Sequence, residues 1–343
     1  MSGSHERRQA RPRPTAHDVA ALAGVSQSAV SRAYTEGASI SPAAREKVLR
    51  AATQLGYRPN LIARSLITRR SRLIGVAMSY MDNQFFPAML EALSIGFHAH
   101  GYRMVLFTPD ADGDADPILD EILRFQVDGV ILASARVTSR FAESCAQAHV
   151  PVVLLNRRTE STAVSSVTGD NEAGGRAIAD FLLAGGHRSF GFLAGLDDAS
   201  TSREREHGFT MRLREAGFAA PVRVSGSYDF NEASAAMRRL LAGPDAPEAV
   251  FCANDHMAIA AIQIARSEYG RSVGQDLSIV GFDDVGPAAW PAFDLTTYSQ
   301  PVDLMAERVV AVTLDHLNDA QYRPVQATVP GRLVVRGSAR IPR

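Results

Sequence analysis

Hydrophobic positions along the chain follow two patterns, and one gives way to the other near residue 72. Before that point, apolar residues recur at helical spacing in three short stretches. After it, apolar runs of strand length alternate with amphipathic stretches of helical length. We therefore predict a small all-α unit followed by a larger α/β unit, because strand–helix alternation is typical of parallel sheets covered by helices on both faces.

The three short helices of the first unit are marked by their ends. A Ser or Thr stands at each start, where its side chain can cap free N–H groups, and a Gly follows the first and third helices. The helices are predicted at 17–23 after Thr15, at 27–35 after Ser26, and at 42–55 after Ser41. The first two, joined by a tight turn at Gly24, form a helix-turn-helix pattern.

The second of these helices carries polar residues on one face. Val25 and Val30 are spaced to pack against the first helix, which leaves Ser28 and Arg32 free to reach outward. The major groove of DNA admits one α-helix, whose N-terminal residues then face the base edges, and an Arg can donate two hydrogen bonds to a guanine. Helix pairs of this size are common in proteins, so this pattern alone leaves DNA binding and ordinary packing both open.

The second unit is predicted to form two lobes, since nine or more strands fit two sheets better than one. Residues 169–171 are the expected crossing between the lobes. Predicted strands lie at 73–79, 103–107, 129–133, 150–155, 165–167, 190–193, 222–224, 249–252 and 277–282. Predicted helices lie at 85–100, 172–183, 201–216, 231–241, 256–269 and 302–318. We expect an N-lobe of about 72–168 plus 299–322 and a C-lobe of about 170–296 plus 325–340.

Charge is distributed unevenly between the two units. Residues 1–72 hold 13 Lys and Arg against 4 Asp and Glu, whereas the remainder holds 23 against 33. The near-neutral total therefore conceals a basic head on an acidic body. Such a head is suited to a polyanion, while the acidic body favours solubility.

The remaining composition argues for a cytoplasmic protein. Cys145 and Cys252 are far apart and have no metal or redox spacing, so we expect reduced thiols. The first residues are polar and lack an apolar signal segment, and the longest apolar runs are too short to span a membrane. We expect no metal, because His256 has no suitably spaced second ligand, and no cofactor.

Several stretches resemble the LacI/GalR family of repressors, and the resemblance extends over the whole chain. They are DVAALAGVSQSAVSR (18–32), EKVLRAATQLGYRPNLIARSL (46–66), CANDHMAIAA (252–261), SIVGFDD (278–284) and RLVVRGS (332–338). The resemblance implies a helix-turn-helix domain at 15–58 after a basic flexible tail at 1–14, then a hinge helix within a linker at 59–71. It also implies a two-lobed effector-binding and dimerisation domain at 72–343, with the fold of periplasmic sugar-binding proteins (type I).

The resemblance also implies how DNA is contacted. The hinge helix folds on DNA beside its symmetry mate, and an apolar wedge that enters the minor groove matches Leu66. The stretch AYTEGASI (33–40) departs from the family pattern, which puts in doubt the contacts of that loop and which bases are read. The expected DNA-binding residues are Thr15, Ser26, Gln27, Ser28, Ser31, Arg32, Tyr57, Asn60, Ala63 and Leu66.

Ligands of such α/β folds bind at the carboxyl ends of the strands, where polar residues gather in this chain. The effector-binding residues implied by the resemblance are Phe85, Phe86, Asn156, Arg203, Phe230, Asn254 and Asp283. Asn, Asp and Arg suit hydroxyl groups, and the Phe rings offer flat faces for a sugar or a base. Arg157 and Arg158 are interpreted as solvated loop residues, with an acidic ligand as the alternative.

Taken together, we expect a homodimeric transcriptional regulator that binds a dyad-symmetric operator in double-stranded DNA, most often as a repressor. A small-molecule effector, a sugar or sugar derivative, would control its affinity for DNA. Two alternatives are a solute-binding receptor and an enzyme acting on sugars. The receptor would have no use for residues 15–70, and the sequence lacks the phosphate-loop, nucleophile-elbow and zinc-protease motifs.

Overall fold

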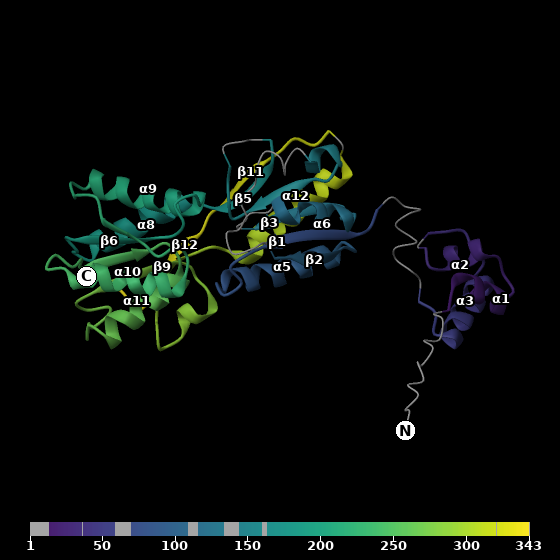
Figure 1. Cartoon of the computed structure of the whole chain (residues 1–343), viewed down its shortest axis with the longest axis horizontal. Helices are drawn as coiled ribbons and strands as arrows, with labels where there is room; N and C mark the ends of the chain where they lie inside the picture. The colour runs from purple at the N-terminus through teal and green to yellow at the C-terminus, as the bar shows by residue number, and fades with distance from the viewer. Residues whose placement is uncertain are drawn as a thin grey trace, which may run out of the picture. The chain divides into compact units, whose positions relative to one another are not determined.

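The computed structural model describes residues 14–35, 37–58, 70–108, 116–133, 144–159, 163–319 and 321–342 (Figure 1). The chain divides into two compact units after Ser71. The predicted DNA-contacting residues Asn60, Ala63 and Leu66 lie outside the described residues, as do nearly all of the predicted basic tail and most of the predicted linker.

The first unit is a three-helix head whose helix ends follow the predicted capping pattern. It comprises α1 (Ala16–Ala23), α2 (Gln27–Ala33) and α3 (Pro42–Leu55). Thr15 and Asp18 form a reciprocal capping box at the start of α1, and Gly24 ends that helix in the left-handed conformation, with φ of 65°. Val19, Val30 and Val48, one from each helix, are almost fully buried and form the centre of the head core.

The second unit begins with a lobe built on a six-stranded sheet, the N-lobe, in which every recorded strand pairing is parallel. The spatial order is β11-β5-β4-β3-β1-β2. The strands are β1 (Leu73–Met78), β2 (Arg103–Phe107), β3 (Gly129–Ala133), β4 (Val152–Leu155), β5 (Ser165–Gly169) and β11 (Gln326–Val329).

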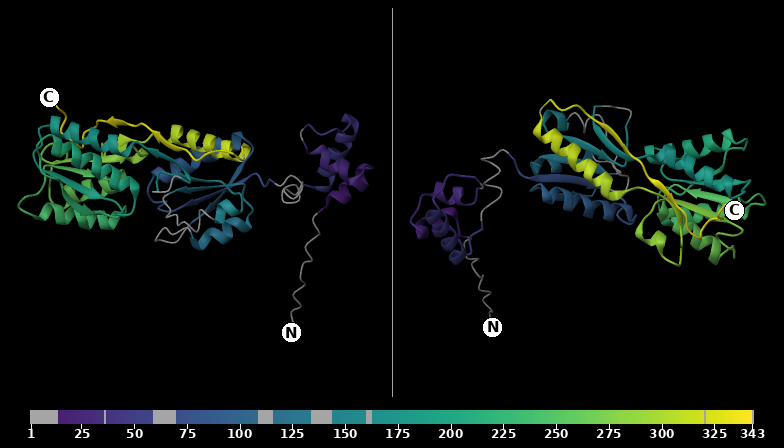
Figure 2. Two further views of the ribbon diagram at one scale, coloured as in Figure 1. Left: turned by 90° about the horizontal axis from the view of Figure 1, so that it is seen from above. Right: turned by 180° about the vertical axis from the view of Figure 1, so that it is seen from behind.

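Helices cover both faces of the N-lobe sheet (Figure 2). They are α5 (Phe85–Ala99), α6 (Asp116–Arg124) and α12 (Val302–Asn318). Alternate residues of β1 enter different apolar clusters: Ile74 joins the cluster that contains residues of α5 and α12, and Ala77 joins the cluster of α6. A strand buried on both sides reads as a continuous apolar run, which is the pattern that predicted it.

The C-lobe has a second six-stranded sheet, in the order β12-β10-β9-β8-β6-β7, with β12 antiparallel to β10. Its strands are β6 (Phe190–Ala194), β7 (Val222–Ser225), β8 (Ala249–Cys252), β9 (Ser278–Asp283), β10 (Thr296–Ser299) and β12 (Arg332–Val334). Its helices are α8 (Asn171–Ala184), α9 (Ser200–Glu215), α10 (Phe230–Ala242), α11 (Asp255–Ser267) and the short η1 (Gly286–Ala289).

A row of aromatic rings in the C-lobe core leads towards the junction of the lobes. Phe209 of α9 contacts Phe251 at 5.1 Å between ring centroids, and Phe282 of β9 contacts Tyr298 of β10 at the same distance. Phe251 and Phe282 complete the row at 6.4 Å. Because these rings are fully or nearly fully buried, the row fixes α9 against the sheet.

The chain passes between the lobes three times, after β5, after β10 and after β11. The crossings touch: the Asp170 N–H donates to the carbonyl of Val329, and a Cβ on Gly169 would lie 2.4 Å from the side-chain oxygen of Gln300. Gly169 therefore leaves the space that Gln300 fills.

Two predicted lobe boundaries are wrong. The segment 325–340 was assigned to the C-lobe, but β11 pairs with β5 in the N-lobe sheet, and only β12 and the residues after it lie in the C-lobe. β10 also belongs to the C-lobe sheet, so the chain returns to the N-lobe after Ser299 rather than at it. The sequence pattern missed all three of these strands because they are three or four residues long and partly polar.

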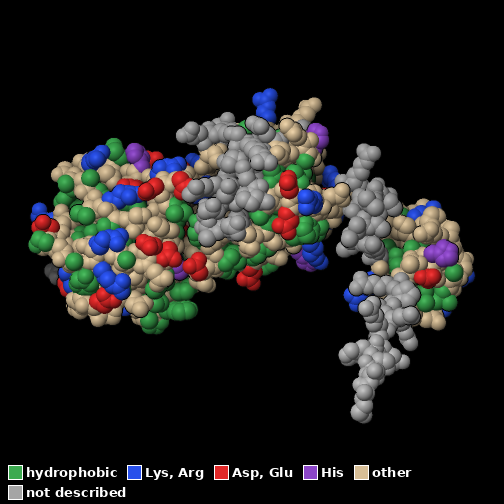
Figure 3. Space-filling model, viewed as in Figure 1, with side chains coloured by type: hydrophobic (Ala, Val, Ile, Leu, Met, Phe, Trp, Pro, Cys, Tyr) green, Lys and Arg blue, Asp and Glu red, His purple; other side chains and the backbone are tan. Residues whose placement is uncertain are grey.

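No described helix is long and apolar enough to cross a membrane. On the face of the second unit seen in Figure 3, acidic and basic side chains are interspersed. Both cysteines are free and buried, and burial raises the pKa of the Cys145 thiol to about 11. Cys145 is therefore a packed, unreactive thiol.

Candidate ligand pocket and nucleic-acid interface

A pocket lies between the lobes at the carboxyl ends of their strands and contains about 440 Å³ of empty space, part of it open solvent. The N-lobe contributes Tyr80, Asn83, Phe86, Asn156 and Arg157. The C-lobe contributes Leu196, Ala199, Thr201, Arg205, Tyr228, Asn254 and Asp283. This is the edge at which open α/β sheets bind ligands.

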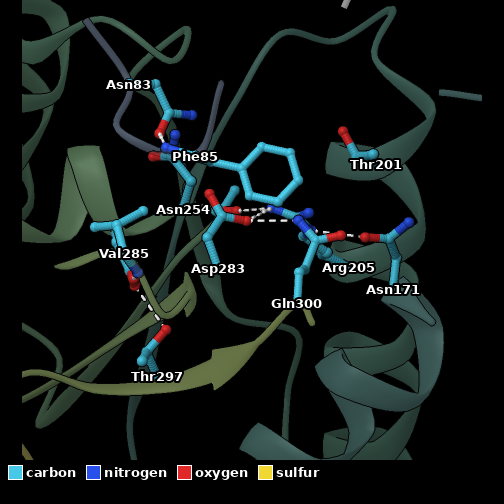
Figure 4. A network of polar contacts seen from close by, with 12 residues as sticks. Asn83, Phe85, Asn171, Thr201, Arg205, Asn254, Asp283, Val285, Thr297 and Gln300 are labelled. Carbon is cyan, nitrogen blue, oxygen red and sulfur yellow. Dashed lines mark hydrogen bonds and ion pairs between the residues drawn. The ribbon is translucent and has the colours of Figure 1, made fainter. Parts of the chain in front are cut away.

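Asp283, at the end of β9, receives side chains from both lobes and from a crossing segment (Figure 4). Gln300 donates a hydrogen bond of 2.7 Å to its Oδ1, and the guanidinium of Arg205 lies 3.5 Å from the same oxygen. Burial raises the pKa of Asp283 to about 6, while Arg205 and hydrogen bonds from Gln300 and Asn83 oppose that rise. Asp283 is therefore ionised for the most part at neutral pH, yet is easily protonated below it.

Arg205 is the largest of the fully buried side chains, with 2% of its surface exposed. Its guanidinium carbon lies 3.7 Å from the centroid of the Phe282 ring, and its Nε donates to Asn171 at 2.9 Å. Its Nη2 atom has no hydrogen-bond partner among the described residues. An unpaired donor on a buried cation is costly, so this group is suited to a ligand acceptor.

Two asparagines present further free polar atoms to the pocket. The Oδ1 of Asn254 caps α11 by accepting the N–H of Met257 at 3.0 Å, which leaves its Nδ2 buried and unpaired within the described structure. Asn156 follows β4 with φ of 54°, and its Oδ1 is buried and unpaired in the same sense. One donor and one acceptor beside Arg205 suit a ligand that carries hydroxyl groups, because a hydroxyl both donates and accepts.

Asp255 supports the site from behind and takes no direct part in the pocket lining. It is fully buried, and its two oxygens accept from Thr297 Oγ1 at 2.6 Å and from the Val285 N–H at 2.9 Å. Burial raises its pKa well above the usual range, and the nearby Asp283 adds to the rise. Asp255 thus joins α11 to β10 and to the loop after β9, which holds Asp283 in place.

Three predicted pocket residues point elsewhere. Arg203 is exposed, and its guanidinium donates to the backbone carbonyl of Asp197 at 3.1 Å. Phe85 is 1% exposed and packs in the core beside Phe86, which alone of the two lines the pocket. Phe230 also lies outside the lining, and its ring contacts His256 at 5.7 Å between centroids.

Arg205, which sequence reasoning missed, occupies the position intended for Arg203. Two residues on a helix lie about 200° apart, so Arg203 and Arg205 necessarily face opposite sides of α9. Thr201, Arg205 and Phe209 recur every four residues and lie on the same, buried face of this helix. That helical spacing was the signal that could have identified Arg205.

Arg157 corrects a second interpretation. It was expected to be a solvated loop residue, but it is 8% exposed and lines the pocket. Asn83, Thr201 and Tyr228 were also missed as pocket residues; the Thr201 hydroxyl lies 3.2 Å from that of Tyr228. The predicted residues Phe86, Asn156, Asn254 and Asp283 are brought together as expected.

In the head, α2 presents a polar face and buries an apolar one. Ala29, Val30 and Ala33 are buried, whereas the predicted contact residues on or beside this helix are exposed; they are Ser26, Gln27, Ser28, Ser31 and Arg32. The exposed face has the polar N-terminal end that contacts base edges in major-groove docking.

The two other described DNA-contact candidates have structural partners. Thr15 is exposed and forms the capping box of α1, and Tyr57 is half-buried with its ring 6.3 Å from that of Tyr34.

Comparison with known proteins matches both units. Residues 15–60 match the description of bacterial regulatory proteins of the lacI family, and residues 179–339 match a periplasmic binding protein-like domain. The HTH-type transcriptional regulator CelR of Thermobifida fusca is 32% identical over 337 residues, which cover 96% of this chain and 99% of that protein.

Solved structures agree with this relationship. A complex of the transcriptional regulator CelR with cellobiose has a TM-score of 0.73 at 31% identity, and covers 95% of this chain and 100% of its own. The lac repressor dimer bound to operator and the anti-inducer ONPF has a TM-score of 0.86 at 26% identity, and covers 96% and 100%. The chain belongs to the LacI family of bacterial regulatory proteins.

Proposed function

We propose that this protein is a transcriptional repressor that binds operator DNA through its head and responds to a small-molecule effector held between its lobes. The observation that carries the proposal is the pairing, in one chain, of an outward polar face on α2 with a pocket that contains unpaired buried polar atoms. The relationship to CelR and the lac repressor supports both parts.

The effector is a sugar or a sugar derivative. Asn254 supplies a donor and Asn156 an acceptor for its hydroxyls, Arg205 supplies a further donor for an oxygen of the ligand, and Phe86 and Tyr228 supply flat apolar surfaces for a ring. The complex of CelR with cellobiose supports this class of ligand.

The effector acts by changing how the lobes meet. Contacts already join the two lobes: Asn83 donates to Asp283, and the backbone N–H of Arg158 donates to Ser200 Oγ at 2.9 Å. A ligand that binds one lobe arrangement better than another shifts the population towards it, and the resulting coupling to DNA affinity would be about 1–3 kcal/mol.

The protein acts as a homodimer on a dyad-symmetric operator, in the cytoplasm, without a cofactor or a catalytic step. The crystal structure of a dimeric lac repressor on its operator supports the homodimer, because two symmetric half-sites require two heads. We also propose that Asn60, Ala63 and Leu66, within the linker at 59–71, contact the DNA. The relatives named above are DNA-binding regulators, which supports a non-enzymatic role.

A pair of variants on one helix tests this function. Operator binding is measured with and without members of a panel of sugars, sugar acids and polyols that includes cellobiose. Arg205→Lys is expected to lose the response to the active compound, whereas Arg203→Ala, on the opposite face of α9, is expected to keep it.

A second pocket variant keeps the test valid if Arg205→Lys does not fold. Asn254→Ser keeps a capping oxygen for α11 but removes the free Nδ2, so it is expected to weaken the response and leave operator binding intact without the compound. The assignment fails if both pocket variants respond like the unaltered protein, or if no dyad-symmetric duplex is preferred at low salt.

A further inference from the structure

The helix that forms one wall of the pocket begins without a side-chain cap. The N-cap of α9 is Ala199, whose side chain has no oxygen to accept a hydrogen bond from the first N–H groups. Three other C-lobe helices are capped by side chains: α8 by Asp170, α10 by Asp229 and α11 by Asn254. The first N–H groups of a helix have no partner within it and carry the positive end of its dipole, so α9 presents donors that its own sequence does not satisfy.

This uncapped end faces the pocket. Ala199 and Thr201, which flank the first helical residue, both line it, and Ala199 is 3% exposed. Figure 4 places Thr201 at the start of α9, bordering the same space as the guanidinium of Arg205. The N-terminus of α9 is thus directed to the ligand site rather than to bulk solvent.

A second, independent feature points to the same kind of ligand. Arg205 lines the pocket, and its Nη2 is buried and has no hydrogen-bond partner within the described structure. Arg157, also nearly buried, lies in the lining too. A guanidinium with a free N–H group and an uncapped helix start both favour an anion.

We propose that the effector carries an anionic group, a carboxylate or a phosphate on a sugar-like body, and that this group binds at the N-terminus of α9 beside Arg205. The proposal rests on the function proposed above and narrows its ligand class. The hydroxyl-bearing part of the effector faces Asn156, Asn254 and Asp283, and the anion faces Ala199, Thr201 and the arginines.

The charges around the pocket agree with this orientation. Asp283 is the one carboxylate among the described residues that line the pocket, and it is already engaged by Gln300, Asn83 and Arg205. Asp197, close before α9 in sequence, directs its 78% exposed side chain to Arg223 on the surface. The described lining therefore holds two arginines and one carboxylate.

Matched pairs of compounds test the proposal on the full-length protein. Each set compares a neutral sugar with its acid or phosphate derivatives. The sets are glucose with glucuronate, gluconate and glucose 6-phosphate, galactose with galacturonate, and cellobiose with cellobionate. Thermal shift followed by calorimetry measures each dissociation constant. At least one anionic member is expected to bind ten times or more tightly than its neutral parent, and the comparison of acids with the phosphate identifies the anion.

A designed carboxylate tests where the anion sits. Ala199→Asp places a capping carboxylate where the ligand anion would lie, so it is expected to weaken anionic binding at least tenfold. Ala216→Asp is the matched control, because it adds the same charge at the exposed C-terminal end of α9 and is expected to leave binding unchanged. Arg157→Gln is a second pocket variant, expected to weaken anionic binding and not neutral binding. The melting temperature without ligand verifies that each variant folds.

The outcomes separate this inference from the proposed function. If a neutral sugar binds as tightly as its acid and alters operator binding, the regulator stands and the anionic effector is refuted. The inference is equally refuted if no anionic compound raises the melting temperature, or if Ala199→Asp and Ala216→Asp behave alike.

Discussion

At the residue scale, the properties of the site depend on how little water reaches its charged groups. Asp283 is 4% exposed, and its carboxylate is held by one amide from the N-lobe, one from a crossing segment and the guanidinium of Arg205. These partners partly offset the cost of burying the charge, which leaves the pKa of Asp283 at about 6.

Asp283 is expected to make the stability of the second unit depend on pH in an unusual direction. A carboxyl whose pKa is raised in the folded state contributes stability that is complete below its unfolded pKa of about 3.9 and is lost as pH rises through about 6. The loss is at most about 3 kcal/mol, from two pKa units at about 1.4 kcal/mol each. Asp283→Asn removes this titration while retaining the shape of the side chain.

Urea unfolding at pH 4.5, 5.5, 6.5 and 7.5 checks this expectation. The free energy of unfolding of Asp283→Asn relative to the unaltered protein should increase over that range, because only the unaltered protein must ionise a buried group. Taking the difference cancels acid effects shared by both proteins. A difference that stays constant with pH would mean that Asp283 ionises as freely as an exposed carboxyl.

Arg32 is the residue in the head for which sequence and structure agree most directly. It lies exposed in the last turn of α2, and we expect it to read a base edge. Arg32→Ala should reduce specific operator affinity by roughly 1–3 kcal/mol and relax the choice of base at one position of each half-site.

Arg50→Ala serves as the control for the loss of one positive charge from the head. Arg50 is exposed on α3 and pairs with Glu46 one turn away. Its removal should change operator affinity little, as measured by titration of operator and scrambled duplexes at fixed salt. Equal losses for the two variants on both duplexes would show that Arg32 contributes only general charge.

At the element scale, the contact of α8 with α9 sets the position of the pocket arginine. A Cβ on Gly175 would lie 2.3 Å from the backbone oxygen of Arg205, and a Cβ on Gly208 would lie 2.1 Å from that of Glu172. The two helices therefore approach through their backbones, and any added atom must push α9 away. Since Arg205 starts from this contact, its reach into the pocket depends on two residues that have no side chain.

Gly175→Ala is expected to destabilise the fold by about 1–3 kcal/mol through overpacking and to weaken effector binding as α9 shifts. Gly243→Ala is the control, because the nearest heavy atom to its added Cβ is 4.0 Å away and its φ of −81° suits alanine. Thermal unfolding gives the stability, and calorimetry with the active compound gives the binding. If Gly175→Ala is destabilised but binds the compound as before, the contact between α8 and α9 does not control the position of Arg205 in the pocket.

At the scale of the whole molecule, basic and acidic residues are distributed unevenly between the head and the rest of the chain. The basic residues of 1–72 exceed the acidic ones by nine, whereas the rest of the chain has ten more acidic than basic residues. Non-specific attraction to DNA is therefore expected to come from the head, because the body is net negative.

Operator affinity should accordingly fall steeply with salt. A dimer with six or more phosphate contacts would lose about a thousandfold in affinity between 50 and 200 mM salt, because each contact releases counterions. Fluorescence anisotropy with labelled operator at several salt concentrations gives the slope. Binding that hardly changes with salt would contradict the basic head as the contact surface.

How much the sequence predicted depended on how local each feature is. The helices of the head, the long buried strands and most helices of the lobes were predicted, since capping residues and apolar runs act within a few neighbours. The strands β10, β11 and β12 were missed, because three or four residues carry too little pattern and their pairing partners are up to 160 positions away.

The sequence by itself determined the family, the two-unit organisation and the chemistry available at the strand ends, because these follow from motifs, charge and periodicity. Only the tertiary structure decided which polar residues meet. In that structure Arg205 faces the pocket and Arg203 faces solvent, while Phe85 lies in the core and Arg157 lines the pocket. For the two arginines of α9 the physical reason is that side-chain direction depends on the rotation of the helix about its axis, which is set by packing against α8 and the aromatic row rather than by the adjacent residues.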